Sequence, residues 1–290
     1  MRALTPVAVV VSVALALSGC GGSSKQASTH GKRTLTPGGG RGATQPPVAN
    51  GGAPRSVQRL IPPASAPAKS VRVPVLTYHR VVTEPAVGQL DLKIDPAVFL
   101  AEMEALEDHG FHTISQARLF NALYRGKALP SKPVLLTFDD GYVDDIRTIL
   151  PDLARLHMVG TFFVITGRMR EPGFLGADQI RALDQAGMDI GDHTAHHVDL
   201  RLITPAQLTM ETLGSRRALQ RVLQHFVYSF AYPFGATNAT VQAAVRAAGY
   251  TLAYTTAGGE TETTAAPLAM PRIHVGRSET PSGLVSLLGG

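Results

Sequence analysis

The stretch PVLLTFDDGYVDDIRTILPDLARLHMVGTFFVI, residues 133–165, predicts a strand, a helix and a second strand in succession. Residues 134–138 form a continuous apolar run, and residues 161–165 form another. Between them, residues 143–157 have helical spacing, although Pro151 fits a helix interior poorly. Strands that are apolar on both faces and separated by helices are typical of a parallel sheet with helical cover.

The same alternation continues on both sides of this stretch. The other strands are expected at 73–78, 111–115, 188–190, 227–231, 251–255 and 273–275. The other helices are expected at 96–109, 116–125, 177–186, 205–225 and 240–248. Seven or eight strand–helix units favour an α/β fold in which residues 71–290 form a single (β/α) barrel.

The first 19 residues predict an export signal. Residues 7–17 are apolar but too few to span a membrane as a helix, and Arg2 precedes them. The sequence Leu17-Ser18-Gly19-Cys20 resembles the lipobox of bacterial lipoproteins, in which the Cys is lipidated. It contains the only Cys of the chain, which excludes an intramolecular disulfide. We therefore expect a lipid-anchored, extracytoplasmic protein attached to the cell membrane through Cys20.

Residues 20–70 are expected to be a disordered linker. Between residues 21 and 70, 22 positions are Gly, Pro or Ser, and residues 1–70 contain no acidic residue. The formal net charge of the whole chain is +5, but residues 71–290 carry 19 basic and 22 acidic side chains. The basic character belongs to the tail, so the charge does not indicate nucleic-acid binding.

Polar residues capable of chemistry follow several of the predicted strands. Because active residues of parallel α/β folds lie at the carboxyl ends of strands, these positions are the candidates. His193 and His197 are four residues apart, a spacing that puts both rings on one face of a helix or helical turn. One carboxylate of Asp139 and Asp140 could complete a site with two His and one carboxylate for a divalent ion, leaving the other as a base.

These motifs resemble the polysaccharide deacetylase family, also called the NodB-homology domain or carbohydrate esterase family 4. The resemblance rests on Thr137-Phe138-Asp139-Asp140-Gly141, on His193-Thr194-Ala195-His196-His197 and on Tyr232-Pro233-Phe234-Gly235. It implies that Asp140, His193 and His197 bind the metal and that Asp139 is the base for the attacking water. Zn²⁺ is the favoured ion, with Co²⁺, Ni²⁺, Fe²⁺ and Mn²⁺ as alternatives.

The resemblance also implies roles for residues near the reacting group. The backbone N–H near Phe234 would stabilise the oxyanion, with Tyr232 beside it, and His274 would be the general acid. The family's third motif has an Arg where this chain has Ala231, and Arg272 is our candidate for supplying that charge. No clear counterpart of the fourth motif is present.

The segment Tyr78-His79-Arg80 is similar to a mark of the subgroup that deacetylates poly-N-acetylglucosamine. Tyr78 and His79 could line the site, and Tyr142 could stack on a sugar. We therefore expect a metal-dependent hydrolase that removes N-acetyl groups from N-acetylglucosamine units of an extracytoplasmic polysaccharide. The alternatives are a peptidoglycan or chitooligosaccharide deacetylase, or a polysaccharide-binding lipoprotein without catalysis.

Overall fold

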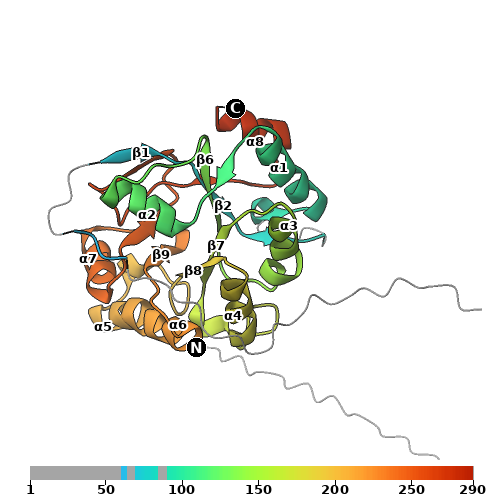
Figure 1. Cartoon of the computed structure of the whole chain (residues 1–290). Helices are drawn as coiled ribbons and strands as arrows, with labels where there is room; N and C mark the ends of the chain where they lie inside the picture. Colours follow the sequence, from blue (N-terminus) through green and yellow to red (C-terminus); the bar gives the residue numbers. More distant parts are fainter. Residues whose placement is uncertain (1–59, 64–68, 84–89, 290) are drawn as a thin grey trace, which may run out of the picture. The chain divides into compact units, whose positions relative to one another are not determined.

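The computed structural model describes residues 60–63, 69–83 and 90–289 (Figure 1). The predicted signal peptide, Cys20 and most of the predicted linker lie outside these residues. Among the described residues, no helix is both long enough and apolar enough to cross a membrane.

Strands and helices alternate through most of the described chain. The strands are β1 (Ser70–Arg72), β2 (Val75–Tyr78), β3 (Arg80–Val81), β4 (Lys93–Ile94), β5 (His112–Thr113), β6 (Pro133–Phe138), β7 (Gly160–Val164), β8 (Asp189–Asp192), β9 (Ser229–Ala231), β10 (Leu252–Tyr254), β11 (Thr261–Thr263) and β12 (Ile273–His274). The α-helices are α1 (Pro96–Asp108), α2 (Gln116–Arg125), α3 (Leu150–Arg155), α4 (Ala177–Gln185), α5 (Pro205–Thr209), α6 (Ser215–Leu223), α7 (Ala239–Ala248) and α8 (Pro281–Leu287).

The main sheet is parallel and curled. Its strand order is β10-β9-β8-β7-β6-β2-β12, with β5 also paired to β6. Its two ends approach each other because Met270, a few residues before β12, bonds to Ala253 and Thr255 at β10. The α/β barrel expected from the sequence is confirmed, in the form of a curled, incompletely paired sheet.

The long helix expected at 205–225 is present but has a π-helical turn, Met210–Gly214, between α5 and α6. A second π turn, Asp145–Ile149, precedes α3 and accommodates Pro151 in that helix's first turn. Two small sheets, β1 with β11 and β3 with β4, had not been expected.

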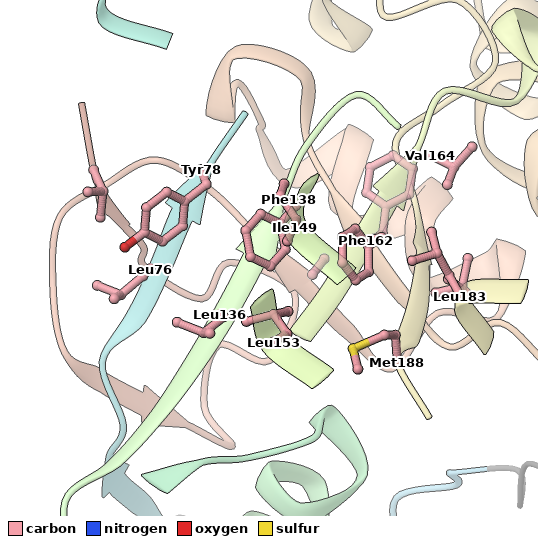
Figure 2. Packing of buried hydrophobic residues seen from close by; sticks show 14 of the residues in the cluster. Leu76, Tyr78, Leu136, Phe138, Ile149, Leu153, Phe162, Val164, Leu183 and Met188 are labelled. Carbon is pink, nitrogen blue, oxygen red and sulfur yellow. The ribbon is translucent and has the colours of Figure 1, made fainter. Parts of the chain in front are cut away.

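Two apolar clusters lie on opposite faces of the curled sheet. Leu136 and Phe138 of β6 pack toward α3 and α4 in the larger cluster (Figure 2). Leu135, between them, belongs to the smaller cluster with Val75, Phe163 and Tyr254. Alternate side chains of a strand point to opposite faces, so β6 must be apolar along its whole length to fill both clusters.

The smaller cluster includes Leu60, which is buried. Packing of this domain therefore begins at least ten residues before the boundary at 71 that the sequence analysis set. The composition of 20–70 did not reveal this contact because a single Leu produces no periodic pattern.

Candidate active site

Strand β6 ends in two buried acidic residues. Asp139 is 3% exposed and Asp140 8% exposed. Asp140 has φ +80°, a left-handed conformation in which non-Gly residues are uncommon. The following Gly141 also has positive φ, and a Cβ there would press on Val164 of β7. Because of this turn, the two carboxylates point in different directions at the carboxyl end of β6.

The two histidines that we expected on one helical face lie instead on an irregular loop after β8. Thr194 and His197 both have positive φ, so the chain reverses and brings the rings of His193 and His197 together, with centroids 4.9 Å apart. The spacing suited a helix or a helical turn, but the rings meet on a loop because buried acceptors shape this segment. The Asp192 carboxylate accepts from the N–H of Thr194, and Glu211 accepts from the N–H groups of Ala195 and His196.

Asp140, His193 and His197 form a candidate metal site. The Nε2 atoms of His193 and His197 lie 3.6 and 3.5 Å from Oδ1 of Asp140. Within the described part of the chain, this buried oxygen has no hydrogen-bond partner. One potential ligand atom from each residue lies within 4.8 Å of the others. The donor set of two imidazoles and one carboxylate fits a first-row divalent cation.

The surroundings keep the two imidazoles suited to metal binding. Nδ1 of His193 donates to the carbonyl of Ala231 at 2.8 Å, which leaves Nε2 with its lone pair toward Asp140. Burial lowers the pKa of His193, and burial together with the neighbouring His193 lowers the pKa of His197. Both rings are therefore neutral near pH 7, as metal ligands must be.

Asp139 is held by Arg272. The guanidinium donates from Nη1 to Oδ1 at 2.8 Å and from Nη2 to Oδ2 at 2.7 Å, and Arg272 is only 1% exposed. Burial alone would raise the pKa of Asp139, but Arg272 and the adjacent His193 more than offset it and hold that pKa well below its usual range. The contact expected between Arg272 and Asp139 is thus present.

His79 and His274 form a pair at the ends of β2 and the neighbouring β12. Their ring centroids are 5.8 Å apart, and Nε2 of His274 lies 3.2 Å from Oδ2 of Asp91. His79 is the more buried of the two, and burial lowers its pKa despite the nearby Asp139 and Asp140. His79 therefore lies close enough to Asp139 and Asp140 for each carboxylate to raise its pKa.

Phe234 and Tyr142 each lie beside one of the candidate metal ligands. Phe234 is 64% exposed, has φ +59° and meets the ring of His197 edge to face at 4.8 Å. The Tyr142 hydroxyl lies close enough to Asp140 for each group to affect the pKa of the other, and the Tyr142 ring stacks on Phe174. Both aromatic rings are thus next to the ligands that the sequence analysis chose.

Two expected substrate-contacting side chains are buried elsewhere. Tyr78 is fully buried, stacks on Phe138 and donates its hydroxyl to Glu102 of α1 at 3.1 Å (Figure 2). Tyr232 is also fully buried, with its hydroxyl on the carbonyl of Leu268. We correct both assignments: strand alternation turns Tyr78 away from the face that His79 shares with the site, and Tyr232 packs in the larger cluster.

Two acidic residues that orient the site were missed. Glu211 is buried and also pairs with Nδ1 of His196, whose side chain is 59% exposed and is not among the candidate ligands. Glu211 is three residues after Leu208 and four before Ser215, so its place on the buried helical face was a usable signal. Asp91 gave no such signal because its partner His274 is 183 positions away.

The family model for polysaccharide deacetylases matches residues 126–253. YxkH of Bacillus subtilis (strain 168), assigned by name to the polysaccharide deacetylases, is 30% identical over 51% of this chain and 52% of its own length. The deacetylase PplD of Streptococcus pyogenes, solved in complex with acetate, superposes with a TM-score of 0.70 and 29% identity over 76% of this chain and 99% of that chain.

Two further curated relatives match shorter stretches. The peptidoglycan-N-acetylmuramic acid deacetylase PdaA of Bacillus subtilis (strain 168) is 32% identical over 36% of this chain and 38% of its own length. The poly-beta-1,6-N-acetyl-D-glucosamine N-deacetylase of Escherichia coli (strain K12) is 32% identical over 27% of this chain and 12% of its own length.

The fold, the two ordered motifs and these similarities point to one class of protein: residues 126–253 match the polysaccharide deacetylase family, and the chain resembles PplD over nearly the whole of that deacetylase. The chain spans about half the length of YxkH and less of the other two curated relatives.

Proposed function

We propose that this protein is a metal-dependent hydrolase that removes N-acetyl groups from N-acetylglucosamine units of an extracytoplasmic polysaccharide. The observation that carries the proposal is the buried Asp139–Arg272 pair beside the Asp140, His193 and His197 cluster. It supplies a fixed carboxylate base next to a candidate cation site, at the carboxyl ends of parallel strands.

Asp140, His193 and His197 would hold the cation, which when bound would polarise the acetamide carbonyl and lower the pKa of the attacking water. Asp139 takes the proton from that water. Arg272 keeps Asp139 ionised and fixes its orientation through two parallel hydrogen bonds. The backbone near Phe234 remains our candidate for stabilising the oxyanion.

A proton must also reach the leaving amine. His274 is the candidate expected from the sequence, and His79, whose ring is in contact with it, is a second candidate. We place the transfer on His79, because it follows β2 directly beside the end of β6, where Asp139 and Asp140 lie, and because it is more buried than His274. His274 meets the His79 ring edge to face and is oriented by Asp91.

Poly-N-acetylglucosamine is the proposed polymer. Two features support it: the segment Tyr78-His79-Arg80 and the similarity to the Escherichia coli poly-N-acetylglucosamine deacetylase. The similarity to PdaA favours peptidoglycan as the second candidate. The alternative of an inactive binding protein is less well supported, because base, candidate ligands and orienting Arg all lie together.

We further propose that the domain is tethered to the outer side of the cell membrane by a lipid on Cys20. The lipobox-like Leu17-Ser18-Gly19-Cys20 and the acid-free segment 1–70 support this proposal. A long tether would let the catalytic domain reach polymer at a distance from the membrane.

The test is acetate release by the full chain carrying Cys20→Ser. The substrates are β-1,6-linked poly-N-acetylglucosamine, peptidoglycan and chitin oligomers, each with chelator and then with Zn²⁺, Co²⁺ or Ni²⁺ restored. We expect release that chelator abolishes and metal restores, with the first polymer preferred. A preference for peptidoglycan would make peptidoglycan the substrate in place of poly-N-acetylglucosamine. Failure with every polymer at full metal occupancy would refute the enzymatic function.

A further inference from the structure

The charge of the folded domain is unevenly distributed. Residues 71–290 have more acidic than basic residues, yet residues 212–259 contain four Arg and no Asp, Glu or Lys. This stretch includes α6, β9, α7 and β10. Arg217 and Arg221 of α6 and Arg246 of α7 are exposed. Within the part of the chain that the structure describes, none of these three forms an ion pair.

Apolar side chains are exposed beside these arginines. Phe226 is 41% exposed and Ile61 is 56% exposed. A hollow of about 450 Å³ is lined by Arg217, Arg221 and Phe226 among others. A second hollow, of about 280 Å³, is lined by Ile61, Phe226 and Arg246 among others. Because Phe226 borders both hollows, the five residues form one continuous surface, which we call the basal face.

The basal face lies at the opposite end of the sheet from the candidate active site. Phe226 precedes β9, and Thr251, which lines the second hollow, precedes β10. These are the amino ends of parallel strands, whereas Asp139, His193 and His79 follow the carboxyl ends of β6, β8 and β2. In Figure 1, α7 lies beside α5, which leads into α6, and Arg216 of α6 donates to the carbonyl of Ala248 at the end of α7.

The described chain begins at this same face. Leu60 is buried there, and Ile61 beside it is exposed. The 59 preceding residues include Cys20, the proposed site of lipidation. A lipid anchor would therefore connect to the domain at its basal face.

We propose that the basal face docks on an anionic phospholipid surface and directs the active site away from the membrane. Anionic headgroups attract cationic side chains near the membrane surface. Exposed aromatic and aliphatic side chains enter the interface between headgroups and acyl chains. The orientation rests on the proposed lipid anchor, whereas the docking itself requires only the five residues of the basal face.

A single tryptophan tests the contact directly, because the natural chain contains none. In the full chain with Cys20→Ser, Phe226→Trp puts the probe on the basal face. Leu287→Trp puts it on α8, at a position of comparable exposure, 45%. With vesicles of phosphatidylcholine and phosphatidylglycerol, we expect the emission of Trp at 226 to shift to the blue and to be quenched by brominated lipid. The probe at 287 should not respond.

The charge contribution is tested in the Phe226→Trp background. Replacing Arg217, Arg221 and Arg246 by Gln should weaken vesicle binding by roughly 100-fold. Replacing Arg147, Arg170 and Arg277 by Gln removes three exposed charges elsewhere and should change binding by less than about twofold. Vesicles of phosphatidylcholine alone should bind weakly in every case.

Equal responses of the two probes would overturn the proposal, because the basic tail would then hold the domain without docking. A response to soluble polyglycerol phosphate but not to vesicles would also overturn it, in favour of an anionic polymer. Acetate release from soluble oligosaccharide should be unchanged by the three basal substitutions, so failed docking remains distinct from failed catalysis.

Discussion

Arg272 supplies a positive charge that the third motif of the resembled family would place at position 231, where this chain has Ala. It lies just before β12, 133 positions after Asp139, and reaches the carboxylate with both Nη atoms. Its Nε donates to the carbonyl of Thr255. With Ala at position 231, Arg272 is the buried cation that neutralises Asp139.

We predict that Arg272→Gln lowers the free energy of unfolding by about 3–5 kcal/mol, because it leaves the buried Asp139 charge without its partner. It should also lower kcat for acetate release by roughly 100-fold or more. Arg272→Lys, which keeps the charge but loses the paired hydrogen bonds, should be intermediate. Urea unfolding and acetate release measure the two effects.

Arg201→Gln is the matched control, because it removes another Arg paired with an Asp, here Asp199 on the surface. It should leave stability and turnover unchanged. Full activity of Arg272→Gln would show that Asp139 needs no cation.

The two histidines beside the site can be separated by substitution. If His79 delivers the proton, His79→Gln should lower kcat by roughly 100-fold or more while bound metal stays constant. His274→Gln should have a smaller effect, because it removes only a neighbour of His79. Metal content and acetate release are measured for each variant. If His274→Gln lost more kcat than His79→Gln, His274 would be the general acid, as expected from the sequence.

At the scale of elements, short irregular segments position the side chains of the candidate site. The 3₁₀ turn Pro233–Gly235 holds Phe234 at positive φ, and a Cβ on Gly235 would overlap Thr256. The loop 193–197 depends on two more left-handed residues, Thr194 and His197. Such conformations are costly unless the surroundings impose them, and here they gather around the candidate site.

The small β1–β11 sheet contains a buried acid with an abnormal pKa. Glu262 is fully buried, and within the described residues neither of its carboxylate oxygens has a hydrogen-bond partner. Burial raises the pKa of Glu262 to about 8. The folded protein therefore keeps this proton over a pH range in which the unfolded chain, with a pKa of about 4.3, has lost it.

We predict that stability falls as pH rises from about 4 to about 8, by up to about 1.4 kcal/mol per pH unit from Glu262. Below that range Glu262 is protonated in both the folded and the unfolded chain, and its full contribution to stability is present. Glu262→Gln should remove this part of the slope, whereas the exposed Glu107→Gln should leave it. Urea unfolding at pH 5 and pH 8 provides the comparison. Identical slopes in the two variants would contradict a buried, protonated Glu262.

At the scale of the molecule, the candidate active site and the entry of the described chain lie at opposite ends of the sheet. The candidate active site occupies the carboxyl ends of the strands, and the described chain enters at their amino ends. Leu60 anchors that entry in the smaller apolar cluster.

We predict that Leu60→Ala lowers the free energy of unfolding by about 2–5 kcal/mol, because it leaves a cavity in the smaller cluster. Ile61→Ala, its exposed neighbour, should have little effect on stability. Chemical denaturation of the two variants in the full chain is the measurement. Equal stabilities would show that the domain begins after this segment.

The sequence by itself determined the parallel α/β fold and the principal residues of the candidate site. Continuous apolar strands require cover on both faces, and polar groups after such strands meet at one edge of a sheet. Only the tertiary structure decided that Tyr78 and Tyr232 are buried in the core, that Arg272 reaches Asp139 with both Nη atoms, and that Glu211 supports the His loop. The reason is physical: a local pattern specifies the period of an element, whereas contacts over more than a hundred residues depend on how the sheet curls.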